Sequence, residues 1–246
     1  MSTARGRPRR QSVEEKEKRI IAAARTVFRK HGFEGAKVAD IAKRAGVAEG
    51  TVYLYFENKK ALLLGVAAEF YERLTRDAAD GVRKLDTTIE RLSFLSWLHF
   101  VRISKEWQLL AMAMTPYKLS NEYRKTEGYK LNRAYVQVFD EVVRGGIAQG
   151  EIRTDIPLSV MRDVFYGGLE YGARTMRARS AKVSVDSTAA DFMRYFSAGM
   201  LLHPDTPATG NGREGIQAVT TRLEKIASSL EKTLDQPNSM PGHREV

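Results

Sequence analysis

A short stretch of the chain, residues 49–59, gathers side chains that can contact a polyanion. Its small, polar and charged members are Glu49, Gly50, Thr51, Tyr53, Tyr55 and Lys59. Thr51 can hydrogen-bond a phosphate or contact a thymine methyl group, and Gly50 lets a helix backbone approach another surface closely. Phosphate contacts supply affinity for duplex DNA, and base-edge contacts supply sequence selectivity. The partner that this chemistry favours is double-stranded DNA.

Two short helices must position these residues. Residues 38–45 carry apolar side chains at helical spacing, which predicts a helix with one apolar face. Gly46 then offers the left-handed conformation that a tight turn requires. A second short helix is expected after Ala48 and should end near Asn58. Two short helices joined by a glycine-containing turn form the unit that lays its second helix in a major groove.

The order of residues across these two helices resembles the DNA-binding domain of the TetR family of one-component transcriptional regulators. Four segments fill the family's pattern, namely Asp40-Ile-Ala, Ala45-Gly-Val47, Gly50-Thr-Val-Tyr-Leu-Tyr-Phe56 and Lys59. The match spans approximately residues 15–66. The resemblance implies that Tyr53 faces the DNA backbone or bases, while Tyr55 and Phe56 help to anchor the helix. It also implies that Lys59 approaches a phosphate.

Lys37 departs from the family's pattern, which usually has threonine at this position. The threonine hydroxyl would cap the first of the two helices and could reach a phosphate. Lysine cannot accept a hydrogen bond from the helix amides, so we expect this cap to be lost or moved. Its ammonium group could still pair with a phosphate, and Lys37 therefore stays among the predicted DNA contacts.

Positive charge is concentrated in the first quarter of the chain. Residues 1–60 hold 15 Lys and Arg against 7 Asp and Glu, a net charge of +8, whereas residues 61–246 hold 25 against 23, a net charge of +2. A basic patch of this kind is the electrostatic footprint of a polyanion binder. A membrane surface could also attract it, but the first helix lacks the broad apolar face with aromatic anchors that surface helices carry. We therefore predict DNA and no membrane as the partner.

Residues 1–11 are polar and basic and are interrupted by a glycine and a proline, so we expect a disordered arm. Its candidate DNA contacts are Arg7, Arg9 and Arg10. These arginines are either solvated or reach a minor groove or the phosphates beside the domain. Ser12 and Glu15 have the spacing of a capping box, which predicts that the first helix begins there and ends at His31-Gly32.

The rest of the chain predicts further helices, because its apolar residues recur at helical intervals without convincing alternation. The expected ranges are 59–81, 88–104, 106–114, 122–149, 158–181 and 187–202. The predicted fold class is all-α. A three-helix, helix-turn-helix DNA-binding domain should occupy residues 12–60, and a larger helical effector-binding and dimerisation domain residues 61–202.

A linker, an extra C-terminal helix and a disordered tail complete the predicted organisation, over residues 203–214, 215–235 and 236–246. The linker is rich in proline and glycine. The helix has a narrow apolar seam that is shorter than a coiled coil requires. It docks either on its own subunit or against the same helix of a second subunit, and the sequence leaves both possibilities open.

A homodimer is expected, because one recognition helix reads too few bases, whereas a two-fold dimer reads a palindromic operator. In TetR-like proteins the dimer is built from the last two helices of the family fold, which correspond to residues 158–181 and 187–202. The candidate interface residues there are Phe165, Gly168, Gly172, Phe192, Phe196 and Met200. The glycines would allow close packing of helices, which offsets their cost of about 1 kcal/mol each in a helix interior.

The second domain should also hold a small-molecule effector. Large apolar walls with a few polar groups are typical of small-molecule pockets. The candidate lining residues are Trp97, Trp107, Met112, Tyr117, Tyr129 and Tyr166. Each aromatic residue taken singly is more often part of a core than of a pocket. The composition suggests an apolar or amphipathic effector, such as a fatty acyl or aromatic compound.

The resemblance further implies that the ligand-free dimer binds its operator and represses transcription. An effector would then change the separation of the two recognition helices of the dimer, because its affinity differs between the dimer with one separation and the dimer with the other. The alternative is a nonspecific architectural DNA-binding protein. The charge supports that alternative, whereas the large apolar second domain does not.

Other classes of protein are disfavoured by what the sequence lacks. It has no cysteine, no G-x-S-x-G motif and no phosphate-cradling glycine loop, and its four histidines are scattered. We therefore expect neither an enzyme nor a metal site, and no cofactor. No stretch approaches the roughly 18 apolar residues of a membrane span. A basic N-terminus without an apolar segment favours a cytoplasmic location.

Overall fold

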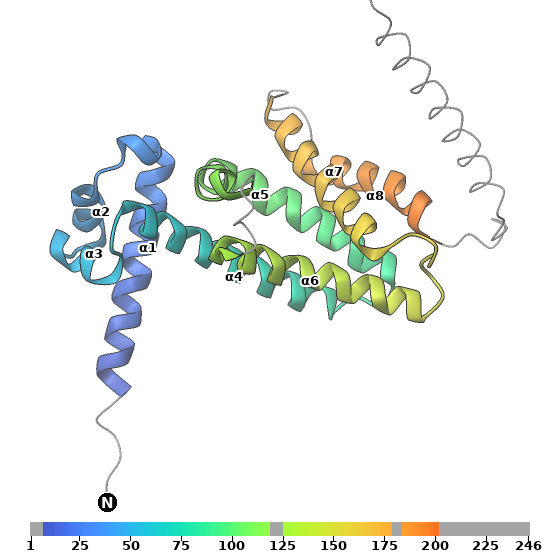
Figure 1. The fold of residues 1–246 in the computed structure, drawn as a ribbon, viewed down its shortest axis with the longest axis horizontal. Helices are drawn as coiled ribbons and strands as arrows, with labels where there is room; N and C mark the ends of the chain where they lie inside the picture. Colours follow the sequence, from blue (N-terminus) through green and yellow to red (C-terminus); the bar gives the residue numbers. More distant parts are fainter. Residues whose placement is uncertain (1–6, 119–124, 179–183, 202–246) are drawn as a thin grey trace, which may run out of the picture. The chain divides into compact units, whose positions relative to one another are not determined.

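The computed structural model describes residues 7–118, 125–178 and 184–201, and these residues form eight helices and no strand (Figure 1). The helices are α1 (Arg7–Gly35), α2 (Val38–Ala45), α3 (Glu49–Tyr55), α4 (Lys59–Val82), α5 (Thr88–Lys118), α6 (Glu127–Ala148), α7 (Leu158–Ala178) and α8 (Val185–Met200). The all-α prediction is confirmed. None of the helices within the described ranges combines the length and apolar character needed to cross a bilayer. The predicted linker, extra helix and tail lie outside the described residues.

The beginning of α1 differs from the prediction. The helix starts at Arg7 instead of Ser12, so residues 7–11 are helical although they were predicted to be disordered. Pro8 falls in the first turn, where its missing N–H costs no helical hydrogen bond, and arginine is a good helix former. The side chains of residues 13–19 are all exposed, and this part of α1 extends beyond the other helices (Figure 1).

The end of α1 follows the prediction more closely. Gly32 has a left-handed conformation, with φ of 71°, which interrupts the helix before it resumes as far as Gly35. The glycine after His31 therefore breaks the helix where the sequence indicated. A residue with a Cβ would be strained at this position.

Two helices predicted over residues 88–104 and 106–114 are one continuous helix, α5. Neither glycine nor proline separates the two ranges, so no residue stops the helix between them. The first proline in this part of the chain is Pro116, and α5 ends shortly after it.

Side-chain caps fix where two helices begin. The Oδ1 atom of Asn58 accepts a hydrogen bond from the backbone N–H of Ala61 at 2.8 Å, so Asn58 starts α4. The predicted end of α3 near Asn58 is therefore wrong, because α3 already ends at Tyr55. The Oγ1 atom of Thr126 accepts a hydrogen bond from the N–H of Tyr129 at 3.2 Å and starts α6.

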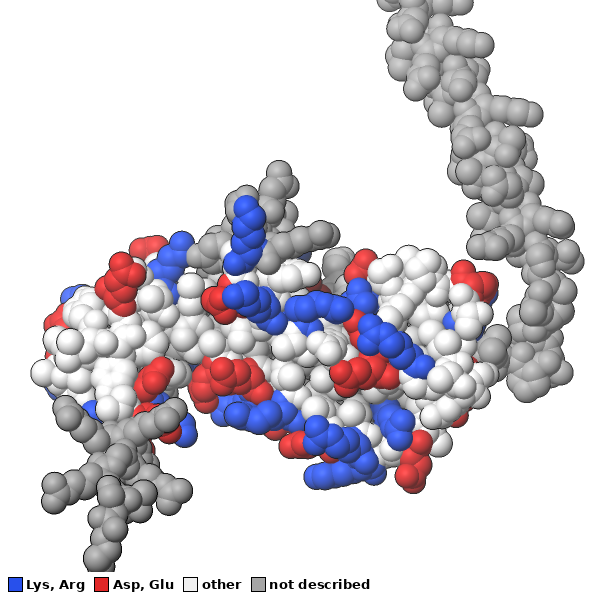
Figure 2. Space-filling view, turned by 60° about the horizontal axis from the view of Figure 1, so that its bottom comes forward, with Lys and Arg blue, Asp and Glu red and all other residues white. Residues whose placement is uncertain are grey.

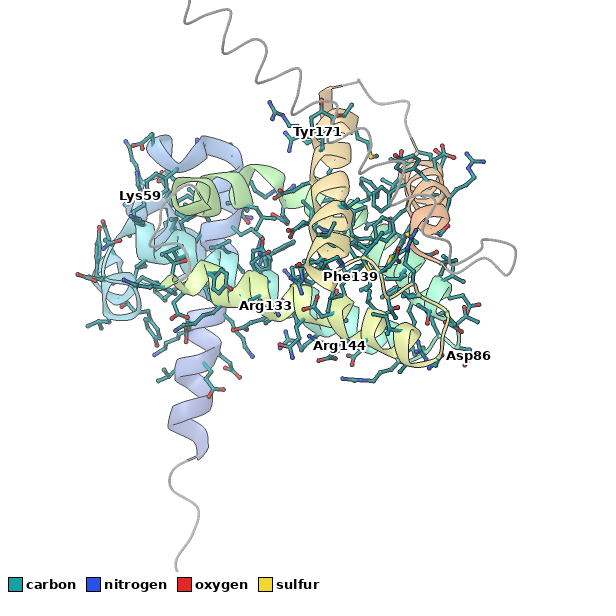
Figure 3. The ribbon with its side chains drawn as sticks, turned by 45° about the vertical axis from the view of Figure 1, so that its right-hand side comes forward. Lys59, Asp86, Arg133, Phe139, Arg144 and Tyr171 are labelled. Atoms are coloured by element: carbon teal, nitrogen blue, oxygen red, sulfur yellow. The ribbon has the colours of Figure 1, made fainter. Side chains whose placement is uncertain are left out.

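The core of the C-terminal helices is aromatic. Phe139 of α6 and Phe165 of α7 lie 4.6 Å apart between ring centroids. Phe165 also contacts two rings of α8, with centroid distances of 5.5 Å to Phe192 and 5.1 Å to Phe196. Offset and edge-to-face aromatic contacts of this kind add to the stabilisation from buried area. One cluster around Phe165 therefore joins α6, α7 and α8 (Figure 3, for Phe139).

A buried carboxylate fastens α6 to α7. Asp140 is fully buried, and both of its oxygens accept hydrogen bonds from Arg162 of α7, at 2.6 and 2.8 Å. Arg133, seven residues before Asp140 on α6, donates a third hydrogen bond at 2.9 Å (Figure 3). The hydrogen bond to Asp140 raises the pKa of Arg162. Because a buried charge must be paired, this bidentate contact fixes how α7 lies on α6.

We expect the substitution Asp140→Asn to lower the free energy of unfolding by about 3 kcal/mol, because Arg162 then faces a neutral group in a partly buried site. Glu141→Gln is the matched control, since Glu141 is the neighbouring carboxylate on the same helix but is exposed. Urea denaturation measures both variants. Equal losses of stability would show that the Asp140 contact contributes no more than a surface interaction.

Candidate nucleic-acid interface

The two predicted short helices are present. The apolar face of α2 is buried through Val38, Ile41, Ala42 and Ala45. Gly46 follows in a left-handed conformation, with φ of 66° and ψ of 40°. Ala48 is extended, with φ of −70° and ψ of 150°, and α3 begins directly after it. The structure therefore confirms a helix, a glycine turn and a second helix in the order that the sequence predicted.

The outward face of α3 is made by Gly50, Tyr53 and Leu54. Val52 is buried against the core, whereas Tyr53 is 48% exposed and Leu54 is 84% exposed. Gly50 and Glu49 are also exposed, while Thr51 is half-buried. Leu54 was not predicted as a contact, although its spacing of four residues from Gly50 places both on one helix face. An exposed leucine on a short helix is available to touch a thymine methyl group.

The C-terminal end of α3 is held against α4. Phe56 is 9% exposed, and its ring lies so close to Gly65 of α4 that a Cβ at residue 65 would come within 2.7 Å of it. Tyr55 is half-buried and packs on the same core. The anchoring role implied for Tyr55 and Phe56 thus agrees with their burial. Gly65, which the sequence analysis missed, provides the space for the Phe56 ring.

Lys59 ties the end of α1 to the beginning of α4. Its ammonium group donates hydrogen bonds to the carbonyl oxygens of Glu34 and Ala36, at 3.2 and 3.3 Å, and lies 4.7 Å above the ring of Phe33. Two of its three N–H donors are therefore engaged inside the protein. Sequence reasoning assigned Lys59 to phosphate, whereas in this structure (Figure 3) it satisfies backbone carbonyls and positions the helix-turn-helix.

Lys37 precedes α2 without capping it. Its backbone is extended, with φ of −105° and ψ of 137°, and no side chain caps the beginning of α2. The expected loss of the family's cap is confirmed. The Lys37 side chain is exposed, so its contact with phosphate stays a prediction. The side chains of the three arginines at residues 7, 9 and 10 lie outside the described part of the structure.

Comparison with known proteins decides the family. Residues 20–66 match the family described as bacterial regulatory proteins, tetR family. Residues 68–193, more than half of the chain, match the family described as YsiA-like protein, C-terminal region. The chain belongs to the TetR family.

Several relatives are similar over most of their length. The fatty acid metabolism regulator protein of Bacillus subtilis is 26% identical over 185 residues, which cover 74% of this chain and 93% of the relative. The transcriptional repressor AcnR of Corynebacterium efficiens is 26% identical over 170 residues, covering 63% and 82%. AcnR is a transcriptional repressor. This TetR-family chain is a DNA-binding transcriptional regulator and not an enzyme.

Two solved structures are also similar to the chain. FadR of Bacillus subtilis, in complex with stearoyl-CoA, has a TM-score of 0.65 and 25% identity and covers 76% of this chain and 99% of its own. FadR of Bacillus halodurans has a TM-score of 0.64 and 25% identity, covering 74% and 98%. The similarity therefore includes the C-terminal helices as well as the helix-turn-helix.

Trp97, a predicted pocket residue of this TetR-family regulator, lies at the surface. It is 39% exposed, and its Nε1–H donates a hydrogen bond to Asp186 at 2.8 Å across a groove of about 440 Å³ between α5 and α8. Trp97 therefore lines an open groove at the surface, and its role in effector binding stays a prediction. The side chains of the pocket candidates Trp107, Met112 and Tyr117 lie outside the described part of the structure.

Tyr166 belongs to a polar cluster inside the effector domain. Its ring lies 5.5 Å from that of Tyr135 and 5.7 Å from that of His99. The Nδ1 atom of His99 lies 3.3 Å from the hydroxyl of Tyr135. Burial raises the pKa of both tyrosines, so their hydroxyls stay protonated. Tyr129, the other described candidate, is half-buried near the start of α6.

Three of the six predicted dimer residues are interior to one protomer. Phe165 is fully buried, and Phe196 and Met200 are 7% and 3% exposed, so none of these three can present a side chain to a partner. Phe192 is partly buried on the same cluster, beside Gly168. Gly168 and Gly172 make room for the rings of Phe192 and Phe100, since an added Cβ would come within 2.7 and 3.0 Å of them. The assignments of Phe165, Phe196 and Met200 to the subunit interface are corrected to packing within the protomer, while those of Phe192, Gly168 and Gly172 stay predictions.

We expect Gly65→Ala to destabilise the protein by about 1–3 kcal/mol, because the new methyl group displaces the Phe56 ring from α4. Gly145→Ala is the matched control, since Gly145 lies in α6 and an added Cβ there meets no atom within 4 Å. That control should be neutral or slightly stabilising. Chemical denaturation measures both, and a Gly65→Ala variant as stable as the control would exclude the packing role of Gly65.

Proposed function

We propose that this TetR-family protein is a repressor that binds a palindromic operator as a homodimer and is released from it by a long-chain acyl-CoA. The observation that carries the effector class is the similarity to the fatty acid metabolism regulator of Bacillus subtilis, which extends over 93% of that protein. The similar FadR structure contains stearoyl-CoA. Both agree with the fatty acyl class suggested by the sequence. As a regulator of chromosomal DNA, the protein would act in the cytoplasm.

The proposed DNA contacts follow from the exposed face of α3. Gly50 brings the backbone of α3 close to the base edges, and Tyr53 and Leu54 project from the same face. Lys37 contributes an exposed cation at the beginning of α2. The N-terminal part of α1, with its three arginines, supplies further contacts to phosphate.

The proposed dimer face lies on the outer sides of α7 and α8. The exposed apolar side chains there are Val160, Val164 and Tyr171 of α7 and Tyr195 of α8, with exposed fractions of 47%, 53%, 71% and 83%. Val160, Val164 and Tyr171 follow at intervals of four and seven residues and so share one face of α7 (Figure 3, for Tyr171). A row of exposed apolar side chains of this kind is typical of a protein–protein interface.

The distribution of charge supports DNA binding by the N-terminal domain and dimerisation by the C-terminal helices. On the face in view in Figure 2, basic and acidic side chains are interspersed over the helical effector domain. Its mixed surface agrees with the net charge of +2 over residues 61–246, compared with +8 over residues 1–60. The excess positive charge that DNA binding requires is therefore carried by the N-terminal domain.

We expect Gly50→Ala to weaken operator binding at least about tenfold, because the added methyl group occupies the space between α3 and the base edges. In the free protein both this methyl group and that of the control variant Gly145→Ala meet no atom within 4 Å, so both variants should fold normally. Fluorescence anisotropy with DNA from upstream of the protein's own gene measures the affinity, and footprinting locates the site.

Stearoyl-CoA added to the same complexes should release the wild-type protein from DNA, whereas coenzyme A alone should not. A discrete protected palindrome supports the regulator, while uniform protection would support the architectural alternative. DNA binding that is unaffected by Gly50→Ala would contradict the contact surface. Operator binding that stearoyl-CoA leaves unchanged would contradict the effector class.

We expect Val164→Glu to convert the proposed homodimer into monomers, because a buried unpaired charge at a subunit contact costs several kcal/mol. Val13→Glu is the matched control, since Val13 is also an exposed valine in a helix but lies on the projecting part of α1. Analytical ultracentrifugation measures the mass of both variants. A wild-type monomer, or a Val164→Glu dimer as stable as the control, would refute this dimer face.

A further inference from the structure

A cleft of about 230 Å³ lies where α1 meets α4 and α5. Five cations line it, namely Arg25 and Arg29 of α1, Arg73 of α4, and Arg102 and Lys105 of α5. Only α1 of these helices belongs wholly to the DNA-binding domain, so the cleft joins that domain to the effector domain. The apolar side chains of Phe70 and Leu74, both buried, also line it. The cleft thus combines a cationic rim with an apolar wall.

The carboxylates around the cleft do not neutralise these cations. Glu69, Asp77 and Glu106 oppose the five cations, which leaves a net charge of +2. Among the described residues, Lys105 has no carboxylate partner. The Nε atom of Arg25 is buried, and it too finds no hydrogen-bond acceptor in the described part of the chain, although the other end of its guanidinium group bonds to Glu69. The cleft therefore has N–H groups that remain available to donate hydrogen bonds to a ligand.

Two of the ion pairs in the cleft are loose. Arg73 lies 3.7 Å from Glu69, and Arg29 of α1 lies 3.9 Å from Glu106 of α5. Pairs at these distances lack a hydrogen bond, and pairs that reach the solvent contribute little to stability. Arg102 and Asp77 make a close contact, at 2.7 Å, and Arg25 also bonds closely to Glu69. A multiply charged anion can therefore replace the loose carboxylate contacts at a small cost in free energy.

Phosphate groups match this arrangement. Arginine binds phosphate with two parallel hydrogen bonds, and such charge-assisted contacts are stronger than loose ion pairs. The apolar wall suits a ligand that carries its phosphates on a longer, partly apolar molecule. We propose that the cleft between α1, α4 and α5 binds the phosphate groups of the effector's coenzyme A head. This inference rests on the proposed acyl-CoA effector and assigns the place where its charged end is held.

Phosphate binding there acts directly on the DNA-binding domain. Arg29 belongs to α1 and Lys105 to α5. An anion that binds both side chains therefore contacts both domains, and it competes with Glu106 for Arg29. The bound head then favours one position of α1 relative to α5 over another. An effector shifts an equilibrium only through such a difference in affinity between two states. The charged head thereby contributes to release from DNA together with the acyl chain.

The test compares two double variants of the full-length protein. Arg73→Gln/Lys105→Gln removes one arginine and one lysine from the cleft. Arg83→Gln/Lys130→Gln removes the same two residue types from exposed surface pairs outside it. Isothermal titration measures the binding of stearoyl-CoA and of stearoyl-pantetheine, which has the same acyl thioester without phosphates. The thermal shift with inorganic pyrophosphate tests free phosphate as the other source.

We expect the cleft variant to bind stearoyl-CoA at least about tenfold more weakly than the wild-type protein, while the surface variant is unchanged. Both variants should bind stearoyl-pantetheine as the wild-type protein does. Equal affinity of all three proteins for stearoyl-CoA would overturn the proposal. Weaker binding of stearoyl-pantetheine by the cleft variant would also overturn it, because the loss would then not depend on phosphate.

The failure of the effector class gives a different result. If the wild-type protein binds neither acyl compound, the proposed acyl-CoA effector is refuted. The cleft is then judged by pyrophosphate alone: stabilisation of the wild-type and surface-variant proteins but not of the cleft variant supports a phosphate site. If pyrophosphate stabilises the wild-type protein selectively while stearoyl-CoA binds all three proteins equally, the site takes free phosphate, and its assignment to the effector's head is overturned.

Discussion

The contact between Phe56 and Gly65 is the constraint on which the position of the recognition helix α3 depends. α3 has only seven residues, from Glu49 to Tyr55, and so short a helix has little stability of its own. Its position comes from Val52 and Phe56, which are buried against the rest of the domain. Because the Phe56 ring lies where a Cβ of residue 65 would be, α3 and α4 approach as closely as side chains allow. The orientation of the exposed face of α3 is thus set by α4.

α4 therefore belongs to both parts of the protein. Its first turn is joined to the end of α1 by the hydrogen bonds of Lys59, while its later turns pack against α5 and α6. A displacement of α4 in the effector domain must carry α3 with it, since the ring of Phe56 leaves no free space between them. This shared helix gives the effector domain a mechanical connection to the DNA-reading surface.

The sequence predicted the features that depend on neighbouring residues. It failed to predict the contacts that depend on residues distant in the chain. The pattern of Ile41 and Gly46 specified a helix and its turn, since periodicity and backbone freedom are local. The partners of Lys59 lie 23 and 25 residues earlier in the chain, and no spacing rule connects them. Likewise, the apolar spacing of Phe165 indicated a buried face but could not tell a core from a subunit contact. In the folded protomer Phe165 is fully buried, so it belongs to the core.

The strengths of these contacts indicate where a conformational change is absorbed. α6 and α7 are joined by the buried, bidentate contact of Asp140 with Arg162, and α7 and α8 by the aromatic cluster around Phe165. Separating either pair would leave a buried charge or a large apolar surface uncompensated. By contrast, α1 and α5 are linked across their cleft by an ion pair 3.9 Å long between Arg29 and Glu106. Because little free energy opposes a change at that contact, we infer that movement started in the effector domain is taken up between α1 and α5, with α6, α7 and α8 moving as one body.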